Sequence, residues 1–542
     1  MIRAPWPEWT LVHLLRRQAR DRGEQPFARF EDGQAFTFGA LDAWTDGLAA
    51  SLAALGVQGG DRVLGLVGNR AEAIGMLFAT VKLGAVWVPV NTGLRGAFLQ
   101  HQLQNAEPRV IVVEDRLAAN LDGVEAGPVP PRALIIVGDP ATATPACARS
   151  ARRLGFGELL ALRAPTGGAP MMPAPGDVAM IMYTSGTTGP SKGVLMPHGH
   201  CYLLGLGLAE ATALGPADRY FVCMPLFHAN ALLMQFLGCL LAGAQVVVTE
   251  RFRATSWLDE VRRAEATVTN GLGVIPEFIF RQPPTARDRD HRLRLMMAVP
   301  IAAEWGAEFE TRFGVPFMQG FGMTECNIVA YTRPGEALVP GCAGYPLAEW
   351  FEVGIVDPAT DAPRPAGQTG EIVVRPKVPG GFMAGYFRMP EKTIEAWRNL
   401  WFHTGDAGRF DDLGRLHYVD RIKDCIRRRG ENISSFEIEQ VLNAHPAIAE
   451  SAVVGVKVAG AGGEDEVKAC VVPAAGAAID PVALLDWCTP RMPHFAVPRF
   501  VEIVSGELPK TPTGKLQKTS LRAAGVTAAT WDREAVGYVV RR

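Results

Sequence analysis

The stretch of the chain that is richest in phosphate-binding groups spans residues 181–194 and reads Ile-Met-Tyr-Thr-Ser-Gly-Thr-Thr-Gly-Pro-Ser-Lys-Gly-Val. It contains three glycines, five serine or threonine hydroxyls and one lysine. Glycines let the backbone turn its N–H groups toward an anion, hydroxyls donate hydrogen bonds, and lysine adds a point charge that suits polyphosphate. An apolar run of strand length, residues 178–183, leads into it. The pattern predicts a strand that ends in a phosphate-binding loop.

Two other interpretations of this stretch are available. Clusters of Gly, Ser, Thr and Pro between periodic segments are typical of surface loops that bind nothing. A Walker A loop requires a glycine directly before its lysine, whereas Pro190 and Ser191 precede Lys192 here. A P-loop fold is therefore disfavoured, and the plain surface loop is the alternative that the other motifs must exclude.

A second candidate motif, residues 318–326, reads Met-Gln-Gly-Phe-Gly-Met-Thr-Glu-Cys. The ring of Phe321 could stack on a purine, and Glu325 beside a hydroxyl could hold Mg²⁺, which prefers a few carboxylate and phosphate oxygens. Taken alone, the same nine residues are equally compatible with a turn that has a core phenylalanine and a solvated glutamate.

Two further motifs lie toward the C-terminus. Residues 401–408 read Trp-Phe-His-Thr-Gly-Asp-Ala-Gly, and the carboxylate of Asp406 could accept hydrogen bonds from two vicinal hydroxyls. Residues 508–518 read Leu-Pro-Lys-Thr-Pro-Thr-Gly-Lys-Leu-Gln-Lys. Their alternatives are a tight turn for the first and solvated surface lysines for the second, which we retain for Lys510 and Lys518.

Together the four motifs resemble those of the adenylate-forming superfamily, which includes acyl-CoA synthetases, luciferases and peptide-synthetase adenylation domains. The first resembles the signature Tyr-Thr-Ser-Gly-Thr-Thr-Gly-x-Pro-Lys-Gly, with the proline displaced to Pro190. The second resembles the aromatic-Gly-x-Thr-Glu motif, with Phe321 in place of the usual tyrosine. The resemblance runs from about residue 11 to residue 522, and the Arg-x-Gly-Glu-Asn-x-Ser loop at 428–434 is similar to that of crotonobetaine/carnitine-CoA ligases.

The resemblance implies an α/β fold. It implies a large N-terminal domain of two stacked α/β sheets plus a small distorted β-barrel, followed by a small mobile α+β C-terminal domain. The AMP- and acyl-binding domain would span residues 1–420, the hinge 421–423 and the mobile domain 424–542. Alternating helical and apolar strand patterns in the N-terminal part independently indicate mostly parallel sheets.

Periodicity predicts individual elements. We expect helices at 41–55 and 72–83, and strands at 62–67, 86–90, 110–113, 133–137, 219–222, 245–248 and 267–270. The apolar segment 231–248 is interpreted as a buried helix, a glycine turn and a strand, and a helix at 434–443 precedes a strand at 451–456. Residues 138–175, rich in Ala, Pro, Gly and Arg, are expected to form a surface excursion and linker. We predict neither a structure nor a function for the tail 523–542.

The resemblance implies a site for ATP, Mg²⁺ and coenzyme A. The catalytic residues would be Lys515, Glu325, Thr184 and His228, with Glu325 and Thr184 at the metal. The small domain would rotate about Lys423 and exchange the Lys515 loop for the loop of Gly430, where pantetheine passes. Residues implied to contact the nucleotide or coenzyme A are Thr184, Ser185, Gly186, Thr187, Thr188, Lys192, Ala298, Val299, Pro300, Gln319, Gly320, Phe321, Thr324, Asp406, Tyr418, Arg421 and Gly430. Of these, the resemblance places Asp406 and Arg421 at the ribose and residues 298–300 at the adenine wall.

The implied acyl pocket is largely apolar. Its residues are Leu226, His228, Ala229, Leu233, Gly271, Val274, Gly320 and Ile328. Residues 222–248 contain no acid, although amino-acid-activating relatives carry an aspartate at or beside the position of His228. A buried substrate ammonium would lack a partner there, which favours an apolar, non-amino carboxylic acid. Whether His228 gates the thiol tunnel or is a packing histidine stays open.

Composition excludes several other classes. With 54 Lys and Arg against 56 Asp and Glu, and no basic stripe, no nucleic-acid partner is expected. The nine cysteines include no Cys-x-x-Cys pair, which fits reduced thiols in a cytoplasmic protein. Neither a secretory signal nor a transmembrane segment is predicted. The oligomeric state is open, with a homodimer among the alternatives.

We therefore predict an AMP-forming acyl-CoA synthetase that converts a carboxylic acid to an acyl-adenylate and then to its coenzyme A thioester. One alternative is an acyl-adenylate synthetase that passes its product to a carrier-protein thiol or a partner enzyme. A second alternative, from another class, is a protein that binds ATP or an acyl ligand without turnover.

Overall fold

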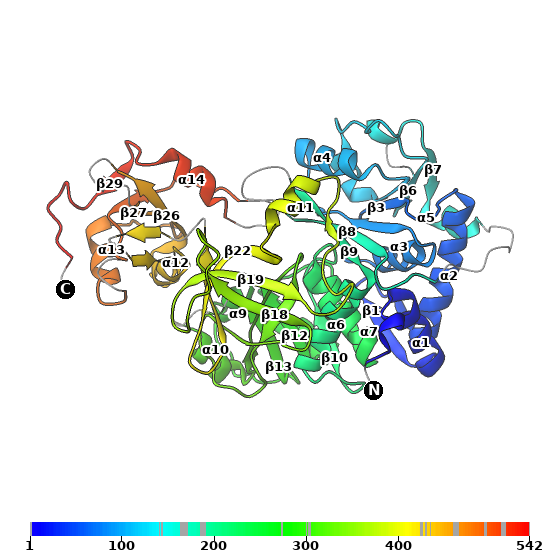
Figure 1. The fold of residues 1–542 in the computed structure, drawn as a ribbon, viewed down its shortest axis with the longest axis horizontal. Coiled ribbons are helices and arrows are strands. Elements are labelled where there is room, and N and C mark those ends of the chain that lie inside the picture. The colour runs from blue at the N-terminus through cyan, green and yellow to red at the C-terminus, as the bar shows by residue number, and fades with distance from the viewer. Residues whose placement is uncertain are drawn as a thin grey trace.

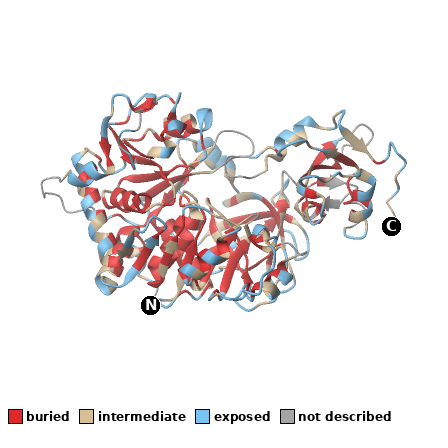
Figure 2. Cartoon of the chain, turned by 180° about the vertical axis from the view of Figure 1, so that it is seen from behind, coloured by how far each residue is buried: buried red, intermediate tan, exposed pale blue. Residues whose placement is uncertain are grey.

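The chain forms a large body and a smaller one at its side, which contains the orange and red C-terminal segments in Figure 1. Buried residues fill the interior of both bodies in Figure 2, because each has its own hydrophobic core. The computed structural model describes residues 3–139, 141, 145–162, 172–184, 191–272, 275–299, 301, 305–422, 426–428, 431–433, 435–458, 465–492, 496–510 and 516–540.

The first sheet of the large body has the strand order β14-β13-β12-β10-β11-β1-β2. In that order its strands are Phe317–Met318, Leu295–Val299, Val268–Leu272, Arg219–Val222, Gln245–Val248, Pro26–Phe30 and Ala35–Thr37. All neighbours are parallel except β1 and β2. The predicted strands at 219–222 and 245–248 are confirmed, and β12 begins one residue later than predicted.

The second sheet has the order β20-β9-β8-β4-β3-β5-β6-β7. Its strands are Gly385–Tyr386, Lys192–Pro197, Val178–Thr184, Val86–Pro89, Arg62–Leu66, Val110–Glu114, Ala133–Val137 and Arg152–Gly155. The strands from β8 to β7 are parallel, whereas β9 and β20 add to the sheet antiparallel. The strand predicted before the phosphate loop is therefore present as β8.

Helices cover one face of each of these sheets and join them through a shared core. The core contains side chains of α1 (Leu11–Arg22), α2 (Phe38–Ala54), α3 (Ala71–Lys82), α6 (His198–Ala211) and α7 (Leu237–Ala242). Along β5, Val110 and Val112 face this core, while Ile111 and Val113 face a second cluster beneath α4 (Gly96–Ala106). Burial of both faces explains why these strands read as continuous apolar runs.

The opposite face of the first sheet is covered by α8 (Trp257–Ala264), α9 (Ile275–Phe280) and α10 (Gly306–Phe313). The segment 231–248 contains a π-helix, Asn230–Phe236, followed by α7, a left-handed Gly243 and β11. The expectation of a helix, a glycine turn and a strand is confirmed. In the parts of the chain that the structure describes, no helix is long and apolar enough to cross a membrane.

The third sheet of the large body is antiparallel throughout, in the order β15-β16-β17-β23-β22-β19-β18. Its strands are Gly320–Met323, Asn327–Tyr331, Cys342–Pro346, Leu416–Arg421, Trp401–Phe410, Gly370–Pro376 and Phe351–Val356, with β21 (Trp397–Arg398) added to β22. A short helix, α11 (Pro390–Ala396), precedes β21. This antiparallel sheet stands where a distorted β-barrel was predicted.

The C-terminal body is α+β, as predicted. It contains a hairpin of β24 (Ile426–Arg428) and β25 (Glu431–Ile433), and a sheet of β26 (Ile448–Lys457), β27 (Asp465–Pro473), β28 (Phe500–Ile503) and β29 (Thr530–Asp532). Its helices are α12 (Ser435–Asn443), α13 (Pro481–Cys488) and α14 (Lys518–Ala524). The predicted helix at 434–443 and strand at 451–456 are confirmed.

Two segments differ from the sequence-based expectation. Residues 152–161, placed in a linker, form β7 and α5 (Phe156–Ala161), which were too short for periodicity to reveal. The uninterpreted tail supplies β29, which pairs with β28 and is held by two contacts between Arg499 and Asp532 of 3.2 and 3.0 Å. The tail is therefore part of the C-terminal core.

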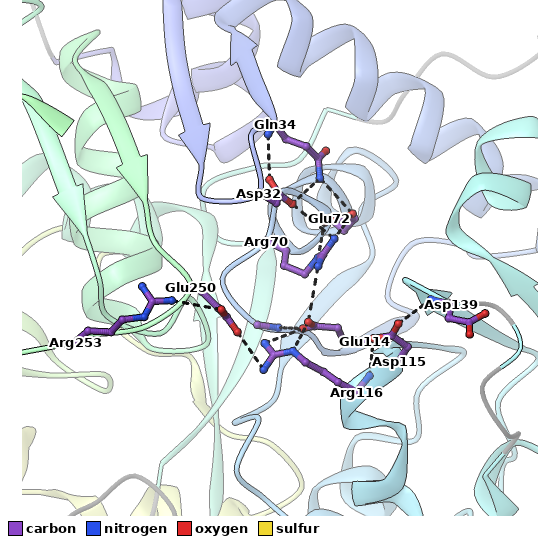
Figure 3. Close-up of polar contacts among 11 residues, drawn as sticks. Asp32, Gln34, Arg70, Glu72, Glu114, Asp115, Arg116, Asp139, Glu250 and Arg253 are labelled. Atoms are coloured by element: carbon purple, nitrogen blue, oxygen red, sulfur yellow. Dashed lines mark hydrogen bonds and ion pairs between the residues drawn. The ribbon is translucent and has the colours of Figure 1, made fainter. Parts of the chain in front are cut away.

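A charged network joins the ends of strands from the first and second sheets (Figure 3). Glu114, buried at the end of β5, accepts a hydrogen bond from the N–H of Gly68 at 3.0 Å and pairs with Arg116. Arg116 also reaches Glu250, just beyond β11, with Nη1 3.4 Å from Oε1. The network therefore couples the carboxyl edges of the two sheets.

We predict that Glu114→Gln lowers the free energy of unfolding by about 2 kcal/mol, since hydrogen bonds to a buried charge contribute ~1.5–3 kcal/mol. Glu352→Gln is the matched control, because its pair with Arg375 is exposed and should contribute less than ~1 kcal/mol. Urea unfolding followed by tryptophan fluorescence measures both. Equal effects of the two variants would contradict a structural role for the network.

Candidate active site

The residues at the two ends of the predicted phosphate loop face each other across an antiparallel strand pair. Thr184 ends β8, Lys192 begins β9, and the two are register partners. The hydroxyl of Thr184 donates to the carbonyl oxygen of Lys192 at 3.5 Å. Predicted residues of the loop itself lie outside the described residues: Ser185, Gly186, Thr187 and Thr188. The hairpin thus holds one hydroxyl and one ammonium at the mouth of this loop.

Glu325 brings a carboxylate from the antiparallel sheet to the same place. It lies in the tight connection between β15 and β16 and is buried, with 4% of its surface exposed. The hydroxyl of Thr184 donates to its Oε1 at 3.3 Å. Although 141 positions separate them, the two residues predicted at the metal are therefore in direct contact.

Tyr386, on β20, is a third member of this group that sequence reasoning missed. Its hydroxyl donates to Oε1 of Glu325 at 3.1 Å. Burial, reinforced by the Glu325 carboxylate, raises the pKa of Tyr386, so the phenol stays protonated and donates. Lys192 Nζ lies 4.0 Å from the centre of its ring. No motif marks Tyr386, because the short strand that carries it is recognisable only from its pairing with β9.

Buried polar side chains hold the Glu325 turn in place. His200, on α6, contacts the carbonyl oxygens of Thr324 at 2.9 Å and Gly381 at 3.2 Å through its two ring nitrogens. Asn327 adopts φ 77° and donates to the carbonyl oxygen of His200 at 3.1 Å. Asparagine tolerates the left-handed region better than most residues, which suits this tight turn.

This arrangement fits Mg²⁺ in the way that the ion is usually held in nucleotide sites. No group of three or more His, Cys, Asp or Glu side chains that could form a protein cage was found among the described residues. Mg²⁺ is commonly bound by one or two carboxylates together with substrate phosphates and waters. Glu325 would supply the carboxylate and Thr184 a hydroxyl, beside the ammonium of Lys192.

The residues predicted to contact the nucleotide or coenzyme A include two aromatic side chains that stack on each other. Phe321 on β15 and Tyr418 on β23 have ring centres 6.0 Å apart and an interplanar angle of 26°. Nearby, the amide of Gln319 donates to the carbonyl oxygen of Val339 at 2.9 Å, so its side chain supports the strand. Ala298 and Val299 end β13.

Asp406 and Arg421, both predicted at the ribose, are register partners on β22 and β23. Nε of Arg421 lies 3.6 Å from Oδ1 of Asp406, and the Asp406 carboxylate is nearly buried. The charges of Glu325 and Asp406 both help burial to raise the pKa of the Cys326 thiol, which indicates that the two carboxylates lie in one region.

Glu371 and His403 position the irregular part of β22 before Asp406, where the register with β19 shifts, and neither was singled out from the sequence. Oε1 of Glu371 accepts from the N–H of Gly405 at 3.0 Å, and Oε2 lies 2.8 Å from Nδ1 of His403. The hydroxyl of Thr404 accepts from the N–H of Asp406 at 3.1 Å. His403 stands in the Thr-Gly-Asp motif, which was the signal available for it.

The predicted acyl residues that the structure describes gather around the shared core. Leu226 and Leu233 belong to it, and Ala229 and Ile328 pack against it. Gly271 on β12 is the register partner of Ala298, so the predicted acyl and adenine walls are adjacent strands. The amide of Asn69, which the sequence analysis missed, holds this segment by donating to the carbonyl oxygens of Met224 and Thr249, both at 2.9 Å.

His228 is partly buried and packs against Phe227, with ring centres 4.6 Å apart and an interplanar angle of 54°. Burial lowers the pKa of His228 to about 4, so the imidazole is neutral at neutral pH. Among the described residues, its side chain has no hydrogen-bond partner. The gate role of His228 stays a prediction.

Five other predicted site residues lie outside the described residues: Val274, Pro300, Lys423, Gly430 and Lys515. The expectation of a solvated surface charge is confirmed for Lys510, which is exposed. It is wrong for Lys518, whose side chain is largely buried. Nζ of Lys518 lies 2.8 Å from Oε1 of Glu439, and that of Lys510 lies 2.9 Å from Oε2 of Glu450. Such contacts depend on tertiary packing and leave no local pattern.

A direct contact crosses the predicted boundary between the domains. Oδ2 of Asp420, in β23, accepts from the N–H of Ser435 at 2.8 Å and from its hydroxyl at 2.5 Å. It also accepts from the N–H of Phe436 at 3.3 Å. A carboxylate on one side of the predicted hinge thus caps the first turn of α12 on the other.

Comparison with known proteins agrees with this geometry. The family model described as "AMP-binding enzyme" matches residues 15–387, and the model of the C-terminal domain of AMP-binding enzymes matches residues 437–515. Over 500 residues the chain is 30% identical to a crotonobetaine/carnitine–CoA ligase of Salmonella typhi, covering 90% of this chain and 93% of the relative. It is 34% identical over 496 residues to a feruloyl-CoA synthase of an Amycolatopsis species, covering 90% and 94%.

Among solved structures, O-succinylbenzoate coenzyme A synthetase (MenE) from Bacillus subtilis, in complex with ATP and a magnesium ion, superposes with a TM-score of 0.79. The sequences are 26% identical, and the match covers 95% of this chain and 99% of that one. Fold and site thus define an adenylate-forming enzyme. The chain belongs to the AMP-binding enzyme family, whose two models match its N-terminal and C-terminal parts.

We predict that Tyr386→Phe raises the Mg²⁺ concentration needed for half-maximal ATP–pyrophosphate exchange by about 10-fold, with the rate restored at high Mg²⁺. Removing a hydrogen bond to a metal-binding carboxylate commonly weakens metal affinity by ~10–100-fold. The ring that lies against Lys192 is retained, so the change isolates the hydroxyl.

Tyr183→Phe is the matched control, because its hydroxyl donates to Asn105 at 2.7 Å and makes no described contact with Glu325. An unchanged Mg²⁺ dependence in Tyr386→Phe, with exchange activity intact, would show that Tyr386 does not orient the carboxylate.

Proposed function

We propose that this enzyme is an acyl-CoA synthetase: it activates a carboxylic acid with ATP and then transfers the acyl group to coenzyme A. The observation that carries the proposal is the contact between Thr184, Glu325 and Tyr386 beside Lys192. It places hydroxyl, carboxylate and ammonium groups together at the mouth of the predicted phosphate loop. ATP, Mg²⁺ and coenzyme A are the ligands that enzymes of this class use.

In the first step, a carboxylate oxygen of the acid attacks the α-phosphorus of ATP. The bond from that phosphorus to the bridging oxygen breaks, and pyrophosphate leaves with the electron pair. Lys192 and the Thr184 hydroxyl would bind phosphate oxygens, and Asp406 would accept from the ribose hydroxyls. When bound on Glu325, Mg²⁺ would supply neutralising charge for the phosphates.

In the second step, the coenzyme A sulfur attacks the acyl carbon, AMP leaves, and the thiol proton passes to solvent. The resemblance assigns adenylation to Lys515 and thioester formation to the loop of Gly430, exchanged by rotation about residues 421–423. The separate hydrophobic cores before and after residues 421–423 support a boundary at this point, and the Asp420 cap on α12 crosses it. A rotation there would break the cap.

The substrate is proposed to be a carboxylic acid without an amino group. Residues 220–248 contain no Asp, Glu, Lys or Arg, so an ammonium or a second carboxylate bound there would be an unpaired buried charge. The apolar walls at Leu226 and Leu233 favour a largely apolar acid.

The alternative acceptors are a carrier-protein thiol and a partner enzyme. Free coenzyme A added to a reaction that already makes acyl-AMP distinguishes them, since formation of acyl-CoA, detected by mass spectrometry, supports the proposal. If acyl-AMP accumulates and no acyl-CoA forms with any accepted acid, the carrier protein or the partner enzyme is favoured as acceptor. ATP binding without exchange by any acid would favour a non-catalytic binding protein.

We propose a cytoplasmic location from the state of the cysteines, and a homodimer as the assembly. The eight described cysteines are free and buried, consistent with the reducing conditions of a cytoplasm. A homodimer remains a prediction that light scattering can test.

We predict opposite defects for variants of the two exchanging loops. Lys515→Ala should suppress acyl-AMP formation at least ~100-fold while sparing conversion of supplied acyl-AMP to the thioester, because its charge is needed only while pyrophosphate leaves. Gly430→Trp should do the reverse, because the glycine leaves room for pantetheine. Separate assays of the half-reactions measure both, and equal losses in folded variants would contradict the two-orientation mechanism.

A further inference from the structure

A cluster of buried amides lies among the predicted acyl-pocket residues. We call Asn230, Gln235, Asn270 and the phenol of Tyr220 the amide cluster. Oδ1 of Asn230 accepts from Nε2 of Gln235 at 2.6 Å and from Nδ2 of Asn270 at 3.2 Å. The hydroxyl of Tyr220 donates to Oδ1 of Asn270. Apart from Asn230, which is partly exposed, all are at most 1% exposed.

The backbone is arranged so that the two amides meet. Residues Asn230–Phe236 form a π-helix, in which residues five apart lie on one face. In an α-helix, residues at i and i+5 would point about 140° apart. The contact between Asn230 and Gln235 therefore depends on this distorted turn, and π-helical turns occur frequently at functional sites.

The cluster occupies the side of the sheet where the acyl group is expected. Asn230 directly follows Ala229, a predicted wall residue. On β12, Val268 faces the shared core, and Asn270 lies on the same side because residues alternate along a strand. Leu226 and Leu233 belong to that core, so the amides would form the polar end of an otherwise apolar pocket.

Part of the hydrogen-bonding capacity of the cluster is unused. Oε1 of Gln235 is buried and has no partner among the described residues. Nδ2 of Asn230 donates to the thioether sulfur of Met234 at 3.4 Å, a weak acceptor. The hydroxyl of Tyr331, which belongs to the same core as Tyr220, is also buried without a described partner. Unsatisfied buried polar groups are uncommon and are costly unless something binds them.

We propose that the amide cluster recognises a neutral hydroxyl group at the end of the acid remote from its carboxylate. A hydroxyl both donates and accepts, so it can donate to Gln235 and accept from Asn230. It must be neutral, because residues 220–248 and 268–272 contain no charged side chain to compensate an ion. The inference rests on the proposed function and refines its substrate to an acid that is apolar along its length and hydroxylated at its far end.

The test compares matched acids with and without the remote hydroxyl, such as 4-hydroxycinnamic and cinnamic acid, or 6-hydroxyhexanoic and hexanoic acid. ATP–pyrophosphate exchange gives kcat/KM for each. In the wild-type protein we expect the hydroxylated acid of at least one pair to be preferred by about 30-fold or more, since sites built for a hydroxyl strongly reject analogues that lack it.

Gln235→Met keeps the volume but removes the acceptor, and should reduce this preference to about 3-fold or less by slowing the hydroxylated acid. Gln18→Met is the control: Gln18 is also a buried amide, but on α1 it donates to the carbonyl oxygen of Leu241. The preference of Gln18→Met for the hydroxylated acid should match that of the wild type. Asn230→Leu is the second variant if Gln235→Met fails to fold by circular dichroism, and the same loss of preference is expected.

Exchange with both members of every pair at similar rates would overturn the inference and leave the proposed function standing. An undiminished preference in folded Gln235→Met and Asn230→Leu would also overturn it, and would indicate that the cluster binds a structural water. If no acid supports exchange, the result would instead contradict the proposed function, and with it this inference.

Discussion

The buried carboxylate of Glu325 is the constraint on which the arrangement of the site depends. A charge removed from water costs several kcal/mol unless hydrogen bonds or opposite charges compensate it. Both described hydroxyl donors to Glu325 belong to the second sheet, Thr184 on β8 and Tyr386 on β20, whereas Glu325 itself connects two strands of the antiparallel sheet. The two sheets must therefore meet at this side chain, beside Thr184, the last described residue before the predicted phosphate loop.

Elsewhere in the large body, other buried polar side chains also hold loops and strand ends in place. Asn69 lies shortly after β3 and donates to the carbonyl oxygens of Met224 and Thr249. These two residues lie shortly after β10 and β11 of the first sheet. Glu371 accepts from the N–H of Gly405 and so fixes the irregular part of β22 that presents Asp406. Backbone groups at strand ends have no sheet partner, so each needs such a side chain when it is buried. The functional loops are thus held by a rigid scaffold.

The segment after His228 departs from regular structure where the acyl group is expected to bind. A π-helix is less favourable than the α-helix that the same apolar residues could form, and an unpaired amide oxygen adds to the cost. Local departures of this kind are usual at functional sites, where stability is exchanged for a binding surface. The neighbouring helices α6 and α7 pack as an ordinary apolar layer.

Much of the fold was predictable because burial on both faces leaves continuous apolar runs in the sequence. Strands β5, β6, β10 and β11 begin where periodicity placed them and end within one residue of the predicted position. The edge strand β7 was missed because its first two residues, Arg152 and Arg153, are exposed and interrupt the apolar pattern. Likewise β29, three residues long, has only intermediate burial and no alternation to recognise.

The sequence by itself determined the class of protein and the residue types of the site, because four motifs occur in one order and each carries a group that nucleotide chemistry requires. Tertiary structure alone decided which side chains meet. Tyr386 joins Glu325 across 61 positions, and Asn230 reaches Asn270 across 40. Periodicity reports only which face of an element is apolar, whereas such contacts depend on how separate elements pack. The physical reason is that a buried polar group must find its partner in space, wherever the chain provides one.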